Sequence, residues 1–545
     1  MSLCCCLLKN FMYFIAFAFV VTLLPGVPPE TTFPFSKITT APHAELQGVL
    51  ELNGYLNGAE RLFENRLYGP ENPLAIGDSI YVGTHLGEVV RVNGEHITHV
   101  AKFGQPCEGP HEESKCGRPL GMAKDIHKDH IIVADAYYGI WQVNVVNGKK
   151  KLLVSMNQEV QGKTPRKPRL ANSVAVHSSG DIYWTDSSSD FGLEDGVFTT
   201  LANPSGRLIH YDRKKNVSTT LIDELYFANG LVISPNEDFI VVAETVTMRV
   251  RKYHLKGEKK GTWEMFLESL PGHPDNLSPA KDGFWLPIVV PSDKENPSLM
   301  GSLPKVPLIR EFLLKFLYLI ETPFRLISNA FPNVYTQKIY HTIGHFESMS
   351  FLYGKRVTIL KVDWSGNIVA TLHATDGAVG GICHVIEVGD YYYLGSPFSK
   401  YMGRVKIPEH LKKEVPVALP QKSAPPTTTA PPPKTTAAPP KTTAAPPTTT
   451  TAPPTTTTPK PTTTTPKPTT TPKPTTTTTT PKPTTTTTQK PATTPPPTKA
   501  PPKPTEKPAE AAKEIPIHED IPSDTKPPKA EKLKVIKKGG EFGEL

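Results

Sequence analysis

Four short segments carry carboxylate or amide oxygens at spacings that could assemble one metal site. They are Gly69-Pro70-Glu71, Leu170-Ala171-Asn172-Ser173, Phe227-Ala228-Asn229-Gly230 and Pro274-Asp275-Asn276. Oxygens of this kind are the ligands of hard cations such as Ca²⁺, which takes six or more of them. Each asparagine alone is equally typical of a turn or a cap. The evidence for a shared site is the spacing of the four segments. Successive segments lie about 50 residues apart or twice that, and about 50 residues is the length of one structural repeat.

The elements that must position these residues are short β-strands. Apolar strands bounded by polar turns recur through residues 51–410, as in GDSIYVGTHLGEVVRV (77–92) and EDFIVVAETVTMRVRKYHL (237–255). A recurrence of about 40–60 residues in an all-β chain favours a β-propeller over a sandwich. Six blades would occupy the range, and their innermost strands would converge on a central channel. The sequence therefore predicts a six-bladed propeller with the four segments at one end of that channel.

One stretch departs from the strand pattern. Residues 304–331 have apolar side chains at helical spacing, and Pro304 and Pro307 lie near the start. We expect an amphipathic helical insertion here. The helix either packs on the propeller or faces a membrane or a substrate as a lid.

The N-terminus predicts export from the cytosol. Residues 11–24 are apolar, follow Lys9 and precede Pro25. The run is shorter than the roughly 20 residues of a full span, but it is long enough when counted from Leu3. We interpret residues 1–27 as a signal anchor or a cleaved signal peptide and 28–50 as a linker. The propeller is then the lumenal or extracellular part of a single-pass type II membrane protein, or it is secreted.

The cysteines agree with an oxidising compartment. Cys107 and Cys116 are nine positions apart in a polar loop, a spacing typical of a local disulfide, with a zinc pair as the alternative. Cys383 lies in an apolar run and is predicted to be a free buried thiol. Asn216-Val217-Ser218 is a plausible N-glycosylation site. Asn276 also begins a sequon, but a metal ligand could not carry a glycan.

The C-terminal part has a composition that cannot form a core. Residues 411–510 hold 29 of the 59 prolines and 37 threonines. Regular proline in a threonine-rich chain is typical of a mucin-like, O-glycosylated stalk, with an unmodified linker as the alternative. Residues 511–545 carry charges of both signs and are predicted to be disordered. The segment 421–510 has a net charge of +9, so the remainder sums to −1 and no basic face for nucleic acid is expected.

Several motifs resemble the strictosidine synthase-like family of six-bladed propellers. They are FANGLVISPNEDFIVVAE, LANSVAV followed by GDIYWTDSSS, CGRPLGM and PDNLSPAKDGFWLP. The resemblance covers roughly residues 45–410, and more distant relatives are the paraoxonases and the gluconolactonase group. It implies a Ca²⁺ in the channel, held by Glu71, Asn172, Asn229, Asp275 and Asn276.

The resemblance carries over the catalytic residues less well. Where the synthase has its glutamate, this chain has Cys383 or His384, and Glu387 comes three or four residues later. The two paraoxonase histidines correspond to Leu120 and a position near Ala136. Strictosidine synthesis is therefore not expected. His384 is the candidate general base, although a histidine bonded within its blade is the competing interpretation.

Two functions remain open from the sequence. One is a calcium-dependent hydrolase of esters or lactones, similar to the arylesterases, in which the cation polarises the substrate carbonyl. The other is a non-catalytic, mucin-like surface receptor or adhesion protein with a structural calcium and glycan-mediated extracellular partners.

Overall fold

The computed structural model describes residues 2–23 and 25–412. The stalk predicted at 411–510 and the charged segment 511–545 lie outside the described residues, apart from positions 411 and 412 in the short helix α7 (Glu409–Lys412).

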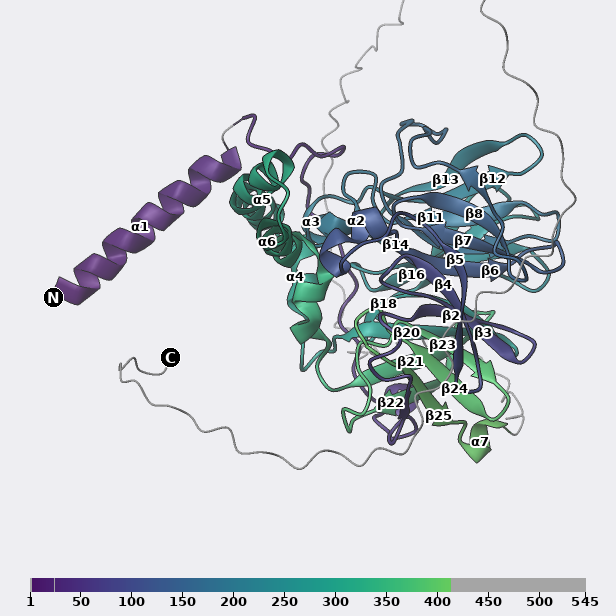
Figure 1. Cartoon of the computed structure of the whole chain (residues 1–545). Helices are drawn as coiled ribbons and strands as arrows, with labels where there is room; N and C mark the ends of the chain where they lie inside the picture. Colours follow the sequence, from purple (N-terminus) through teal and green to yellow (C-terminus); the bar gives the residue numbers. More distant parts are fainter. Residues whose placement is uncertain (1, 24, 413–545) are drawn as a thin grey trace, which may run out of the picture. The chain divides into compact units, whose positions relative to one another are not determined.

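Six antiparallel sheets contain all of the described strands and confirm the six-bladed propeller (Figure 1). The first three blades follow the chain order from the innermost strand outward. Blade 1 is β2 (Glu71–Ile76), β3 (Ser79–Gly83), β4 (Glu88–Asn93) and β5 (His96–Lys102). Blade 2 is β6 (Pro119–Lys124), β7 (His130–Asp135), β8 (Gly139–Asn144) and β9 (Lys150–Val154). Blade 3 is β10 (Ala171–Val176), β11 (Ile182–Asp186), β12 (Gly206–Asp212) and β13 (Val217–Leu225).

The other three blades complete the ring and close it. Blade 4 is β14 (Ala228–Ile233), β15 (Phe239–Glu244), β16 (Arg249–His254) and β17 (Trp263–Leu267). Blade 5 is β18 (Gly272–Pro274), β20 (Gly283–Pro291), β21 (Val357–Asp363) and β22 (Ile368–Ala374), with β19 (Ser278–Ala280) paired to β20. Blade 6 is β23 (His384–Val388), β24 (Tyr391–Gly395), β25 (Met402–Lys406) and β1 (Glu60–Leu62). Because β1 supplies the outer strand beside β25, the two ends of the propeller are joined by main-chain hydrogen bonds.

The blades pack through apolar side chains that alternate along each strand. A cluster between blades 2 and 3 contains Ile132, Ile182 and Trp184, all fully buried. Others repeat this arrangement around the ring, so the core is a series of interblade layers and not a single centre. The arrangement leaves the channel free for polar side chains.

The helical insertion is larger than the sequence predicts. It lies between β20 and β21 and comprises α4 (Leu299–Ser302), α5 (Pro307–Ala330), α6 (Val334–Gly344) and 3₁₀ turns at Leu303–Lys305 and Phe346–Tyr353. The expected 304–331 helix corresponds to α5. The helix α6 was missed because it is short and only partly apolar. Two further short helices, α2 (Glu113–Cys116) and α3 (Gly196–Leu201), lie in loops between strands.

The N-terminal helix α1 (Ser2–Leu23) is long and apolar enough to cross a membrane. A signal sequence meets the same criteria, so the helix fits a membrane-anchored or a secreted protein.

Candidate metal and ligand site

The innermost strands bring all five predicted metal ligands to one end of the channel. Glu71 begins β2, Asn172 lies near the start of β10, Asn229 near the start of β14, and Asp275 and Asn276 follow β18. Each innermost strand changes register with its neighbour at this point, as between Glu71 and Leu74. Such bulges re-aim side chains away from the regular alternation.

Three amide oxygens in this set are buried without a hydrogen-bond donor. The Oδ1 atoms of Asn172, Asn229 and Asn276 have no partner among the described residues. The nitrogen of the Asn229 side chain is engaged, since Nδ2 donates to Thr245 Oγ1 at 3.2 Å. A buried acceptor without a donor costs about 1–3 kcal/mol, so three of them close together are the arrangement expected of cation ligands. The donor set is all oxygen, which suits Ca²⁺.

The two carboxylates of the set also favour a cation. Burial raises the pKa of Asp275 well above its usual range, and the charge of Glu71 adds to the effect. Burial likewise raises the pKa of Glu71, which Arg118 offsets only in part. Two buried acidic groups that repel one another are stabilised by a divalent ion between them.

A cluster of charged side chains adjoins the candidate ligands, and the sequence analysis did not predict it. Arg118 Nη2 lies 3.1 Å from Glu71 Oε2, and Arg118 Nε lies 3.4 Å from Glu113 Oε1. Glu113 Oε2 is in turn 3.1 Å from His345 Nε2, and His85 Nδ1 is 3.4 Å from Glu113 Oε1. Burial raises the pKa of Glu113, but the neighbouring His345, His85 and Arg118 outweigh it and hold that pKa well below its usual range. Glu113 therefore connects three segments that are distant in the sequence.

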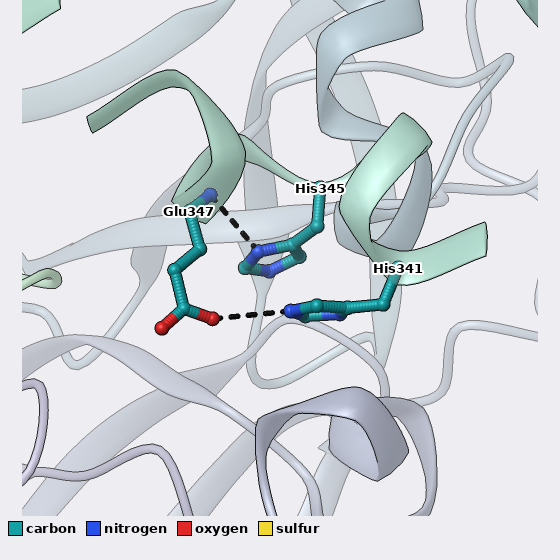
Figure 2. A group of neighbouring side chains, drawn as sticks. All are labelled: His341, His345 and Glu347. Atoms are coloured by element: carbon teal, nitrogen blue, oxygen red, sulfur yellow. Dashed lines mark hydrogen bonds and ion pairs between the residues drawn. The ribbon is translucent and has the colours of Figure 1, made fainter. Parts of the chain in front are cut away.

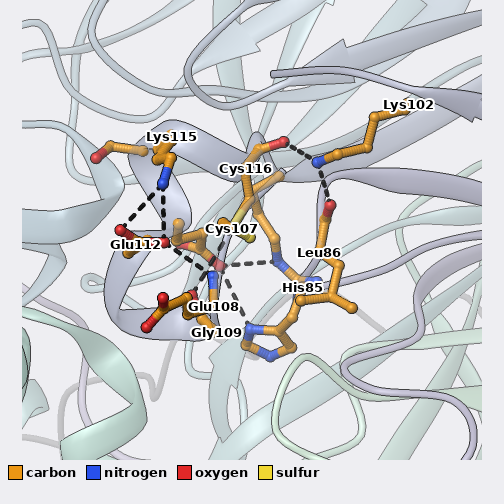
Figure 3. Close-up of a disulfide and its surroundings, with 12 residues drawn as sticks. His85, Leu86, Lys102, Cys107, Glu108, Gly109, Glu112, Lys115 and Cys116 are labelled. Atoms are coloured by element: carbon orange, nitrogen blue, oxygen red, sulfur yellow. Dashed lines mark hydrogen bonds and ion pairs between the residues drawn. A yellow bond between two sulfur atoms is a disulfide. The ribbon is translucent and has the colours of Figure 1, made fainter. Parts of the chain in front are cut away.

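The disulfide positions Glu113. Cys107 and Cys116 are bonded, as predicted, and close the loop that contains α2 (Figure 3). Cys383 is a free buried thiol, also as predicted. Asn216 is exposed at the turn between β12 and β13, whereas Asn276 is fully buried and out of reach of a glycosyltransferase.

The histidines of the insertion form a group with Glu347 at the edge of the site. His341 Nε2 is 3.1 Å from Glu347 Oε2, and the ring of His341 stacks on that of His345 (Figure 2). These three side chains have ligand atoms close enough to hold a metal. His345, however, uses Nε2 for Glu113 and accepts a hydrogen bond from the Glu347 main chain at Nδ1. With both nitrogens engaged, the group serves as a support for Glu113.

A cavity of about 110 Å³ lies between the ligand set and the insertion. Four of the ligands, Glu71, Asn172, Asn229 and Asp275, line it. Apolar side chains from the blades make up most of the remaining wall: Leu120, Leu193, Val246, Val289, Val290. The insertion adds Phe346, Met349, Leu352 and Tyr353. The site is thus an apolar chamber with a polar, metal-suited surface at one point.

Sequence comparisons identify the relatives of this propeller. A strictosidine synthase family model matches residues 172–258, which include Asn172 and Asn229. The chain is 51% identical over 410 residues to the adipocyte plasma membrane-associated protein Hemomucin of Drosophila melanogaster, covering 75% of this chain and 71% of that one. The chain belongs to the adipocyte plasma membrane-associated protein family. The mouse member is 35% identical over 369 residues, covering 66% of this chain and 80% of the mouse chain.

Solved structures with a similar arrangement are much more distant. A gluconolactonase from Xanthomonas campestris matches with a TM-score of 0.40 and 12% identity over 70% of this chain and 99% of its own. A calcium-binding regucalcin from Agrobacterium tumefaciens matches with a TM-score of 0.38 and 12% identity, over 70% and 96%. Similarity at this level carries no argument about the site.

In this member of the family, His384 does not line the cavity. Its neighbour Cys383 packs in the cluster that contains Leu120 and Ala136, whereas the His384 side chain is buried beside Pro73 and does not line the cavity. Alternation along β23 is the reason, since adjacent side chains point to opposite faces. Glu387 is also remote from the cavity wall, and its Oε1 accepts a hydrogen bond from Trp285 Nε1 at 2.7 Å.

The burial of His384 predicts that the folded protein loses stability in acid. Burial lowers its pKa to about 3, so the folded protein keeps it neutral while the unfolded chain binds a proton near pH 6.5. Its contribution to stability is complete above pH 6.5 and is lost as the pH falls toward 3, at about 1.4 kcal/mol per pH unit. The free energy of unfolding of wild type and His384→Gln is measured with urea at several pH values between 3 and 6.5. Its dependence on pH should correspond to about one proton fewer in the variant. Equal slopes would contradict this role.

Proposed function

We propose that this protein is a calcium-dependent hydrolase of esters or lactones with an apolar acyl part, held outside the cytosol by α1. The observation that supports the proposal most is that an apolar cavity adjoins a cluster of buried amide oxygens without donors, two of which, on Asn172 and Asn229, belong to residues of its wall. A purely structural cation has no need of an adjoining cavity. A cation that binds a substrate oxygen needs both a free coordination position and room for the rest of the molecule.

The roles of the residues follow from their positions. Glu71, Asn172, Asn229, Asp275 and Asn276 would hold the Ca²⁺, which supplies polarisation of the carbonyl oxygen when bound. The apolar wall excludes water from the acyl part of the substrate and orients it. The titratable groups that line the cavity outside the ligand set include Glu113, His85 and His345. Activation of water by a general base is assigned to Glu113 or His85 in place of His384, because both ring nitrogens of His345 are already engaged.

The test is turnover of an aryl ester such as phenyl acetate by the full-length chain, with calcium and with a calcium chelator. We expect hydrolysis that falls at least tenfold on chelation and returns when calcium is restored. Asn229→Ala should lose turnover while remaining folded, and Asn216→Ala, at an exposed asparagine, is the matched control. Turnover unaffected by the chelator, or absent from the calcium-loaded protein, would overturn the proposal.

A second candidate is a surface receptor or adhesion protein with a structural calcium. The observation that favours it is the apolar character of Leu120 and Ala136, both buried at positions where the hydrolytic relatives are expected to have histidines. Here the glycosylated stalk would present or space the propeller for extracellular partners. Calcium binding without any ester turnover is the result that would favour this function.

A further inference from the structure

Helix α5 of the insertion has one face that holds it on the propeller. Arg310 is fully buried, and its guanidinium donates to the carbonyl oxygens of Leu201 and Ala202 and to Asn203 Oδ1 at 2.8–3.1 Å. Leu314 and Glu321 are buried on the same side of the helix. These contacts orient the helix, so the direction of its opposite face is set by the fold.

The opposite face of α5 is an unbroken apolar stripe. It contains Leu308, Ile309, Phe312, Phe316, Leu319, Ile320, Pro323, Leu326 and Ile327. At about 100° per residue these positions cover roughly 120° of the helix surface, and none of them is charged. Leu308 and Leu326 are each 63% exposed. A stripe of this length facing water is unfavourable, and it indicates an apolar environment that covers it.

The C-terminal half of helix α1 packs on the N-terminal half of this stripe. The ring of Phe312 meets Phe14 edge to face at 5.9 Å, and the ring of Phe316 meets Phe17 at 6.1 Å. Lys315 Nζ also donates to the carbonyl oxygen of Thr22 at 2.8 Å. The exposed apolar surface of α1 therefore continues directly into that of α5.

The positions of these contacts along α1 show how deep α5 would lie in a bilayer that α1 crosses. Phe17 lies six residues before the end of the helix at Leu23, which corresponds to about 9 Å of helix axis, and Phe14 to about 14 Å. An amphipathic helix in a bilayer interface buries its apolar face by about 5–10 Å. The Phe17 contact falls within this range and the Phe14 contact lies about 4 Å deeper, so α5 would cross the span between the interface and the first acyl-chain segments.

We infer that α5 lies in the bilayer interface at the end of α1, with its apolar stripe toward the acyl chains. The occupant of the stripe is lipid, because the segment whose aromatic rings pack on it is itself a candidate membrane span. The inference does not depend on hydrolysis. It places the roof of the cavity, at Phe346–Tyr353 of the same insertion, close to the membrane surface.

The experiment measures the depth of a tryptophan introduced into the stripe. Full-length Leu326→Trp is reconstituted in phosphatidylcholine vesicles whose acyl chains carry bromine near the headgroup, and the fluorescence of reconstituted wild type is subtracted. Val146→Trp is the control, since Val146 is 76% exposed in the β8–β9 turn at the far end of its blade. We expect at least twofold quenching for Leu326→Trp and none for Val146→Trp.

Two results would overturn the inference. Equal, weak quenching of both variants would show that the stripe does not reach lipid. Quenching that is absent at low protein density, with crosslinking between copies through α5, would show that a second copy covers the stripe. A thermal unfolding curve of Leu326→Trp that matches wild type, expected for an exposed position, shows that the helix itself is intact.

Discussion

Asp275→Asn is expected to unfold at a higher temperature than wild type without calcium and at a lower temperature with it. In the metal-free protein the substitution removes one of two buried acidic groups that repel each other. The pKa of Asp275, raised by burial and by Glu71, shows that ionising this carboxyl is costly there. In the proposed calcium-bound state the same carboxylate would be a ligand, and a neutral amide would bind the ion more weakly.

The expected change in stability on adding calcium is large enough to measure. Calcium at 100 times its dissociation constant stabilises a one-site protein by about 2.7 kcal/mol, and most of this is lost if the variant binds at least 100-fold more weakly. Differential scanning calorimetry with calcium and with chelator gives both signs in one experiment. Asp282→Asn, at an exposed turn seven residues later, is the control. With or without calcium it should change the free energy of unfolding by no more than about 0.5 kcal/mol. A wild-type melting temperature that calcium leaves unchanged would contradict the metal site.

Arg118→Met is expected to destabilise the propeller by about 3–5 kcal/mol. The guanidinium is 1% exposed and lies between two buried carboxylates, Glu71 and Glu113. It also donates to the carbonyl oxygen of Gly69 at 3.0 Å. Methionine keeps an unbranched apolar stem in place of the arginine, so the effect measures mainly the loss of the guanidinium, with its charge and its hydrogen bonds.

The matched control is Arg404→Met. Arg404 pairs with Glu60 at 2.5 Å, but its side chain is 31% exposed and that of Glu60 is 56% exposed. Exposed pairs contribute about 0–1 kcal/mol, because water solvates the charges when the pair is broken. Denaturant unfolding of both variants at pH 7 measures the difference. Similar small losses for the two would show that Glu71 and Glu113 do not depend on Arg118.

The candidate ligands were predictable because each lies in a short motif at a fixed place in its blade. Asn172 and Asn229 both stand near the start of an innermost strand, so a repeat recognised in the sequence places them together without any knowledge of the blade packing. The Cys107–Cys116 disulfide was predictable for a similar reason, since both partners belong to one loop. The position of His384 outside the cavity wall was not predictable in the same way, because one step along a strand reverses the direction of a side chain.

The sequence alone determined the six-bladed propeller and the apolar N-terminus and pointed to the candidate ligands, since periodicity and local motifs encode them. Only the tertiary structure revealed Glu113 as the junction of Arg118, His85 and His345. These residues come from blade loops and from an insertion more than 200 positions later. Their contact depends on how α5 and α6 pack on the channel. Likewise, the sequence showed that α5 is amphipathic, but only packing decides which of its faces meets the propeller. Burial of Arg310 turns the apolar stripe outward, toward α1.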